Sequence, residues 1–122
     1  AAESSAHAEG LTVVLAFRYG GTNEIIRAVR KALTLGVNPE DITEEHFGTL
    51  LDTSGVPPPD LIIRSSGEKR MSNFLLWQAA YSELYFTETL WPDFTREEFF
   101  LALHDYQMRE RRFGTIPARS EF

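Results

Sequence analysis

Short apolar stretches alternate with segments of helical periodicity along this chain, and that alternation is typical of α/β folds. Residues 11–17 (LTVVLAF) and 60–64 (DLIIR) read as strands, and residues 84–90 (LYFTETL) read as a third. The first stretch is apolar throughout, which predicts an interior strand of a parallel sheet. We therefore expect a mostly parallel sheet flanked by helices, in the order strand, helix, helix, strand, helix, strand, helix.

Four segments are predicted to be helices. Residues 23–35 have apolar side chains on one face at helical spacing, namely Ile25, Ile26, Val29, Ala32 and Leu33. A short helix after Pro39 is expected to turn inward Phe47, Leu50 and Leu51. Residues 72–82 also read as a helix. Thr95 and Glu98 form a capping-box pattern, which predicts a last helix from Arg96 to about Arg112.

Bulk composition narrows the class of protein. The 122 residues suit one domain. The net charge of −6 argues against a general nucleic-acid-binding surface, because such domains are basic overall. There is no cysteine, so disulfides and thiolate metal sites are excluded, and no apolar run approaches the roughly 20 residues that span a bilayer. We expect a cytoplasmic protein, with peripheral contact as its closest association with a membrane.

A polar turn follows the apolar residues 61–63, at the end of a strand where open α/β sheets bind their ligands. The turn contains Arg64 and Arg70, and Ser72 follows it. Arginine matches phosphate oxygens two at a time, and a hydroxyl with the amides of a helix start adds neutral donors. The pattern predicts a phosphate or diphosphate site. The alternative is a solvated turn, because loops with two arginines are common.

Two other charged groups are ambiguous by pattern alone. Glu83 could ligate Mg²⁺ beside a diphosphate, since Mg²⁺ favours one or two carboxylates plus substrate oxygens, or it could pair with a nearby base. The basic run at residues 109–112 (RERR) is explained by the helix dipole. Alternatively, this basic run is a second group of cations that binds the same ligand and reaches a neighbouring subunit.

Taken together, these motifs resemble the cis-prenyltransferase family, which includes undecaprenyl diphosphate synthase. Residues 63–78 (IRSSGEKRMSNFLLWQ) are similar to the family signature RTSGExRxSNFLxWQ. Residues 80–86 (AYSELYF), 90–94 (LWPDF) and 109–114 (RERRFG) continue the resemblance.

A second motif supports the same resemblance. Residues 18–25 (RYGGTNEI) are similar to the family's NYGGRxEI turn. Arg18 stands where the family has asparagine, and Thr22 stands where it has arginine. With this turn, the resemblance runs from Leu11 to Gly114.

The family condenses isopentenyl diphosphate with an allylic diphosphate in cis geometry, needs Mg²⁺ and generally works as a homodimer. The resemblance implies a substrate site for isopentenyl diphosphate made of Arg64, Arg70, Ser72, Arg112 and Gly114. Arg112 and the Gly114 backbone would come from the partner subunit. Glu83 would be the catalytic residue and metal ligand of the condensation step.

The family's other characteristic motif is a DGNGRWA-type loop, whose aspartate binds Mg²⁺ and which holds the allylic diphosphate. These 122 residues contain no such loop. We therefore expect a single domain that is the carboxy-terminal portion of a cis-prenyltransferase, inactive by itself. The alternative is a non-catalytic partner subunit of a heteromeric enzyme.

Overall fold

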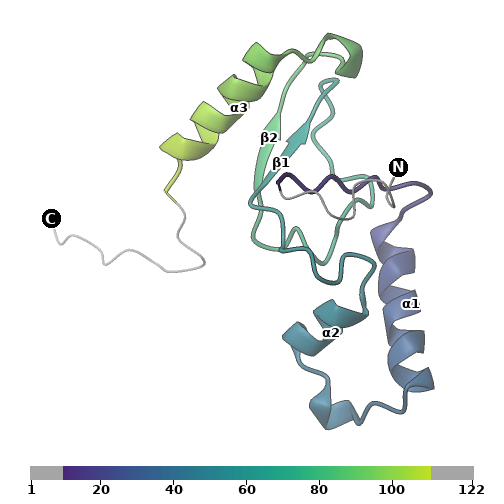
Figure 1. Ribbon diagram of the computed structural model, residues 1–122. Coiled ribbons are helices and arrows are strands. Elements are labelled where there is room, and N and C mark those ends of the chain that lie inside the picture. Colours follow the sequence, from purple (N-terminus) through teal and green to yellow (C-terminus); the bar gives the residue numbers. More distant parts are fainter. Residues whose placement is uncertain (1–9, 111–122) are drawn as a thin grey trace, which may run out of the picture.

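The computed structural model of the chain describes residues 10–110. Its elements in chain order are α1 (Gly21–Thr34), the 3-10 turn η2 (Pro39–Asp41), α2 (Glu44–Leu50), β1 (Leu61–Arg64), β2 (Glu83–Phe86), the 3-10 turn η3 (Trp91–Asp93) and α3 (Arg96–Met108). In Figure 1 the strand pair lies between α3 on one side and α1 with α2 on the other. The predicted α/β class is confirmed.

The two strands are parallel neighbours, as the sequence predicts. Leu61 pairs with Glu83 at the start of the register, and Arg64 pairs with Phe86 at its end. Strand β2 is shorter than predicted, because beyond Phe86 the backbone turns to hydrogen-bond the loop that leaves β1. The arginine-containing loop therefore begins at the carboxyl end of a parallel strand pair.

The helix predicted over residues 72–82 is wrong. This part of the crossover between β1 and β2 consists of turns. Ser72, Asn73 and Leu75 have positive φ values of 47°, 65° and 46°. That left-handed conformation is incompatible with a right-handed helix, so local periodicity was overridden here by the contacts described below.

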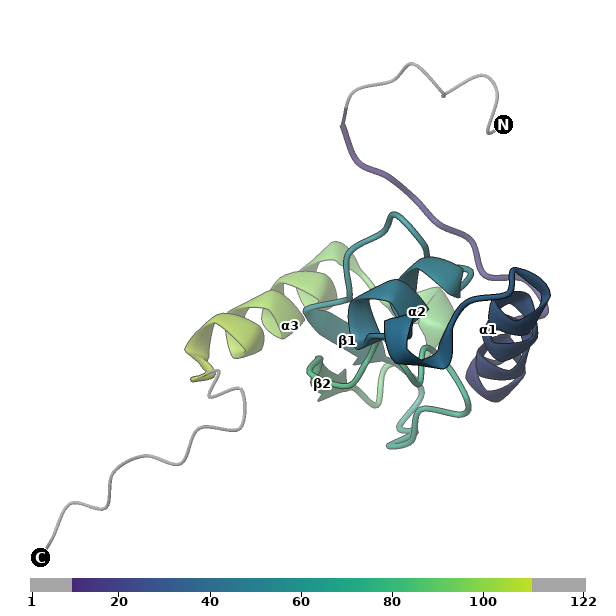
Figure 2. The ribbon, with the colours of Figure 1, turned by 90° about the horizontal axis from the view of Figure 1, so that it is seen from below.

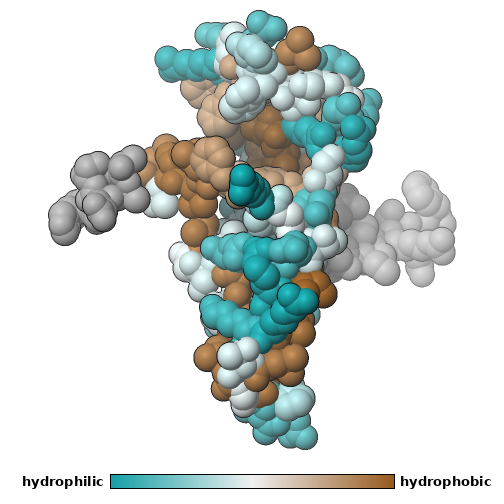
Figure 3. Space-filling model, turned by 90° about the vertical axis from the view of Figure 1, so that its right-hand side faces the viewer, coloured by the Kyte–Doolittle hydropathy of each residue, from teal (hydrophilic) through white to brown (hydrophobic). Residues whose placement is uncertain are grey.

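The strand predicted over residues 11–17 is also wrong. The segment is extended and exposed, with Leu11 at 93% and Phe17 at 83% of full exposure. A strand needs a neighbour for its backbone hydrogen bonds, and within residues 10–110 the sheet has only β1 and β2. Figure 2 shows the segment running away from the folded body, and Figure 3 shows it as an apolar arm.

Helix α1 forms where predicted, but it faces the core differently. Its buried side chains include Glu24, Ala28 and Ala32, whereas three of the residues expected to pack are exposed: Ile26, Val29 and Leu33. Ala28 and Ala32 pack on the residues that α2 turns inward, as predicted: Phe47, Leu50 and Leu51. Because these two alanine side chains are small, α1 can approach α2 closely. The apolar layer between the two helices is therefore thin.

Helix α3 begins as predicted and ends earlier. The Thr95 hydroxyl accepts a hydrogen bond from the Glu98 N–H at 3.4 Å, which confirms the threonine part of the predicted capping box. The Glu98 carboxylate contacts the Thr87 hydroxyl, so it ties the helix to the segment after β2. The helix stops at Met108, because Arg109 takes an extended conformation. Within residues 10–110, no helix is long and apolar enough to cross a membrane.

Candidate functional site

The loop that leaves β1 is fixed against the segment that leaves β2. The Ser66 N–H donates to the Thr89 carbonyl at 2.8 Å, and the Gly67 N–H donates to the Thr87 carbonyl at 2.9 Å. Gly67 has a φ of 70°, and a Cβ there would lie 2.4 Å from a carboxylate oxygen of Glu88. Only glycine fits this turn without displacing Glu88. The tip of the loop is thus held by backbone contacts.

Arg64 is the last residue of β1, Arg70 lies in the loop that follows, and the two are linked. The Nη1 of Arg64 donates to the Arg70 carbonyl at 2.6 Å. This bond uses one of the five N–H groups of the guanidinium, and the rest can serve a ligand. Arg70 forms an ion pair with Glu68, with side chains 66% and 38% exposed. Exposed pairs contribute about 0–1 kcal/mol, so Arg70 can exchange Glu68 for an anion at little cost.

Ser72 follows these arginines in sequence, and its side chain is exposed. The next residue, Asn73, holds this part of the chain against α1. The Asn73 carbonyl accepts from the Gly21 N–H at 2.7 Å. The Asn73 Oδ1 accepts from the Thr22 N–H at 2.8 Å. Gly21 and Thr22 open α1, where backbone N–H groups have no partner within the helix. Asn73 therefore caps α1 from a segment distant in sequence.

Glu83 lies in a separate cluster of charges. Its Oε2 accepts from the Arg109 Nη1 at 2.8 Å, and the Arg109 Nε donates to Asp105 at 2.8 Å. The hydrogen bond with Glu83 is the main cause that raises the pKa of Arg109. In the strand register, Glu83 pairs at the opposite end from Arg64, roughly 10 Å along the strand. The described residues therefore do not bring Glu83 into contact with the loop arginines.

The donor set suits Mg²⁺ only as part of a larger site. No group of three histidine, aspartate or glutamate residues that could hold a metal occurs within residues 10–110. Glu83 offers one carboxylate, which contacts Arg109. Because Mg²⁺ is commonly held by one or two carboxylates and by substrate oxygens, this single carboxylate fits when a diphosphate supplies further oxygens.

A buried glutamate in α1 was missed by the sequence reasoning. Glu24 is 1% exposed, and its carboxylate accepts from the Tyr19 hydroxyl, from the Asp52 N–H at 2.9 Å and from the Gln78 Nε2 at 3.1 Å. Burial first, and then the hydrogen bond with Glu24, raise the pKa of Tyr19 to about 12. The available signal was spacing, because Ala28 lies one turn after Glu24 on the same face.

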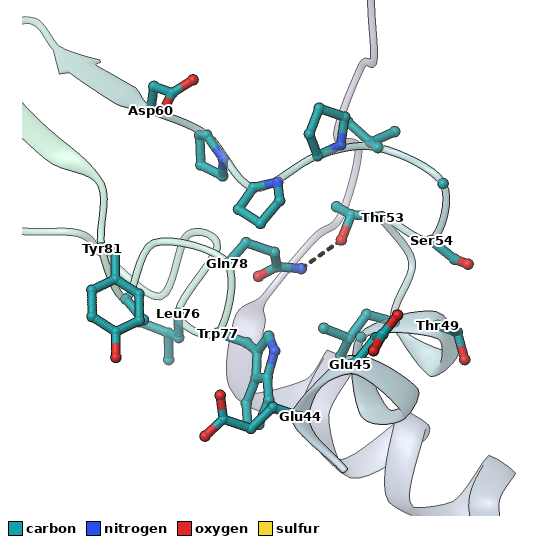
Figure 4. A pocket seen from close by; sticks show the side chains of 18 residues that line it. Glu44, Glu45, Thr49, Thr53, Ser54, Asp60, Leu76, Trp77, Gln78 and Tyr81 are labelled. Carbon is teal, nitrogen blue, oxygen red and sulfur yellow. Dashed lines mark hydrogen bonds between the residues drawn. The ribbon is translucent and has the colours of Figure 1, made fainter. Parts of the chain in front are cut away.

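Gln78 belongs to this hydrogen-bond network and also lines two neighbouring pockets. Its Nε2 also donates to the Thr53 hydroxyl at 2.9 Å, as Figure 4 shows. A pocket of about 1150 Å³ lies between α2, the proline-rich connector and residues 76–81. Neither this pocket nor the smaller one, of about 420 Å³, is lined by Arg64 or Arg70. The predicted anion residues lie outside both pockets, where Arg64 is half-buried and Arg70 and Ser72 are exposed.

Comparison with known proteins decides the family. The family described as putative undecaprenyl diphosphate synthase matches residues 1–114. The chain belongs to this family. The resemblance carried by the sequence motifs is thereby confirmed.

Relatives and solved structures agree with this assignment. An isoprenyl transferase of Rhizobium meliloti (strain 1021) is 57% identical over 111 residues, which are 88% of this chain and 45% of the relative. One from Aquifex pyrophilus is 57% identical over 114 residues, which are 93% and 48% of the two chains.

Among solved structures, lavandulyl diphosphate synthase from Lavandula x intermedia, in complex with dimethylallyl diphosphate, has a TM-score of 0.86 and 42% identity over 93% of this chain and 51% of its own. A probable undecaprenyl diphosphate synthase from Campylobacter jejuni has a TM-score of 0.79 and 40% identity over 93% and 52%. This chain thus spans about half the length of the family members it matches.

Two of the predicted substrate residues, Arg112 and Gly114, lie outside the described residues. The structure does explain one departure from the family motif. Arg18 has a φ of 51°, and asparagine is among the residues that adopt this left-handed conformation most readily. An asparagine at this position of the family turn would therefore have a conformational reason.

Proposed function

We propose that this chain supplies the isopentenyl diphosphate site of a cis-prenyltransferase and forms the carboxy-terminal portion of that enzyme's domain. The observation that carries the proposal is the loop after β1. It holds Arg64 and Arg70 together at the carboxyl end of a parallel strand, beside the exposed Ser72. Membership of the family supports a prenyl diphosphate as the anion, and a structurally similar family member binds dimethylallyl diphosphate.

In this proposal the loop binds and orients isopentenyl diphosphate. Arg64 directs its remaining guanidinium donors at the phosphate oxygens, while Arg70 gives up Glu68 for the ligand. The Ser72 hydroxyl donates a further hydrogen bond. Hydrogen bonds to charged groups contribute about 1.5–3 kcal/mol each, so three such residues are enough for a specific site. Holding the diphosphate fixes where the double bond of the substrate lies.

The reaction joins this double bond to the allylic substrate. A carbon–carbon bond forms between the terminal alkene carbon and the allylic carbon, and the allylic carbon–oxygen bond breaks to release diphosphate. The isopentenyl unit then loses one proton to solvent, which restores a double bond. Mg²⁺, when bound, would stabilise the negative charge of the departing diphosphate. Glu83 would supply a carboxylate ligand, with Arg109 exchanging this partner for an oxygen of the leaving group.

The rest of the site would lie elsewhere. An amino-terminal half with a DGNGRWA-type loop would hold the allylic diphosphate. A second copy of this chain, in a homodimer, would contribute Arg112 and Gly114.

Substitution in a reconstituted enzyme tests the proposal. This chain would be combined with an amino-terminal half that carries the DGNGRWA-type loop. Arg64→Ala and Arg70→Ala should each raise the KM for isopentenyl diphosphate about 10- to 100-fold, the equivalent of one lost charge-assisted contact. Arg30→Ala removes the same charge from an exposed position on α1 and should leave that KM unchanged. Unchanged KM values in all three variants would favour a non-catalytic partner subunit.

A further inference from the structure

The segment that follows Arg70 has an unusual backbone. Ser72, Asn73 and Leu75, none of them glycine, all adopt positive φ values. Such conformations are disfavoured for side chains with a Cβ other than asparagine, so at Ser72 and Leu75 they persist only where the surroundings fix the backbone. They also concentrate at ligand-binding sites. The contacts that impose this conformation on the segment are therefore functional candidates.

The start of α1 supplies these contacts. The carbonyl and the Oδ1 of Asn73 accept hydrogen bonds from the Gly21 and Thr22 N–H groups. A Cβ at Gly20 would lie 2.9 Å from the Asn73 Nδ2. A Cβ at Gly21 would lie 2.9 Å from the Leu76 Cγ and 3.0 Å from its backbone nitrogen. The two glycines thus allow the helix start to touch the segment directly.

The same helix holds the far end of the segment. Gln78 donates its Nε2 to the Glu24 carboxylate, which is buried in the first turn of α1. Residues 73–78 are consequently anchored at both ends to one rigid helix. Loop residues between β1 and Asn73 are held on the other side, where Arg64 binds the Arg70 carbonyl.

We propose that Asn73 is a positioning residue for the diphosphate site. By capping α1 it fixes Ser72 in its left-handed conformation, and through the short link to Arg70 it sets where the loop donors point. Asn73 acts through these neighbours, and the ligand contacts come from the hydroxyl and the guanidinium groups. The inference rests on the proposed function, because the loop must bind a diphosphate for its geometry to matter.

Loss of the Asn73 amide should therefore affect one substrate selectively. In the reconstituted enzyme, Asn73→Ala should raise the KM for isopentenyl diphosphate about tenfold, the effect expected for one lost hydrogen bond. The KM for the allylic substrate, for which farnesyl diphosphate is used, and kcat at saturating substrate should change less than about twofold. Asn73→Asp keeps an oxygen for the Thr22 N–H, at a helix start that favours negative charge, and should lie closer to the parent.

Gly21→Ala perturbs the same segment through the start of α1. Its methyl group displaces Leu76 and should also raise the KM for isopentenyl diphosphate, so the test does not depend on one variant folding. Gly48→Ala is the matched control. Gly48 lies in α2 with no heavy atom within 4 Å of an added Cβ, and this variant should keep the parent's kinetics. Circular dichroism and thermal unfolding of each variant accompany the kinetics.

The outcomes separate the two proposals. Arg64→Ala is measured in the same series. A raised KM in Arg64→Ala with a parent-like KM in Asn73→Ala overturns the positioning role and leaves the proposed function standing. Equal effects on both substrates, or an Asn73→Asp variant no better than Asn73→Ala, overturn it as well. A parent-like KM for isopentenyl diphosphate in Arg64→Ala overturns the proposed function itself.

Discussion

Glu24 makes the sharpest prediction about stability. Its carboxylate is almost completely buried and is contacted by three donors, from Tyr19, Asp52 and Gln78. Glu24→Ala leaves all three donors without this acceptor. Glu24→Gln keeps the size of the side chain and one carbonyl oxygen. Comparing the two variants therefore distinguishes the effect of losing the hydrogen bonds to residue 24 from the effect of losing its negative charge.

The expected magnitudes follow from the number of donors. An unsatisfied buried donor costs about 1–3 kcal/mol. Tyr19 is partly exposed, so its hydroxyl can turn to water, and the other two donors set the cost of Glu24→Ala at about 2–6 kcal/mol. Glu24→Gln should cost about 1–2 kcal/mol. Its smaller effect has a specific reason, because the buried Gln78 Oε1 has no partner and can accept from the new amide.

Urea unfolding followed by tryptophan fluorescence measures these differences, since Trp77 packs on Phe47 in the adjacent core. Glu40→Ala is the control, because Glu40 is exposed in η2 and its removal should change the free energy of unfolding by less than about 0.5 kcal/mol. A cost below about 1 kcal/mol for Glu24→Ala would refute the reasoning about buried donors. Equal costs for the two Glu24 variants would show that the acceptor oxygen is not what matters.

Two further predictions concern Tyr19 and Arg18. The pKa of Tyr19 is raised from 10.0 to about 12, so its contribution to stability should be present below pH 10 and should be lost as the pH rises towards 12. Ultraviolet difference titration should show one late phenol that is missing in Tyr19→Phe. Arg18→Asn should stabilise the chain by about 0.5–1 kcal/mol, because asparagine tolerates the positive φ of this position better. An unchanged urea midpoint would contradict this explanation of the family asparagine.

Local sequence patterns predicted the elements that local forces decide. Helices α1 and α3 and strand β1 follow from periodicity and from the Thr95 cap. The crossover at residues 72–82 has apolar residues at helical spacing too, yet it forms turns. Its backbone is decided by hydrogen bonds between Asn73 and the start of α1, which lies some fifty residues earlier in the chain. No local pattern contains that information.

The candidate site also has one part that local sequence predicts and another part that depends on tertiary contacts. The arginine loop could be predicted, because strand, turn and charges are contiguous in sequence and the structure keeps Arg64 with Arg70. The pairing of Glu83 with Arg109 depends on how α3 packs beside β2, which the sequence does not encode locally. Glu24 was overlooked because a single acid within an apolar stripe is usually assigned to the solvent face.

The exposed segment at residues 11–17 has a consequence for handling the isolated chain. The seven residues are rich in side chains of high β-propensity and contain no charge and no proline, which is the composition of steric zippers in amyloid. Arg18 follows the segment directly, and a flanking charge of this kind opposes fibre growth. The strained arginine would then disfavour both folding and aggregation. Arg18→Asn should fold more stably and yet form fibrils at a lower protein concentration.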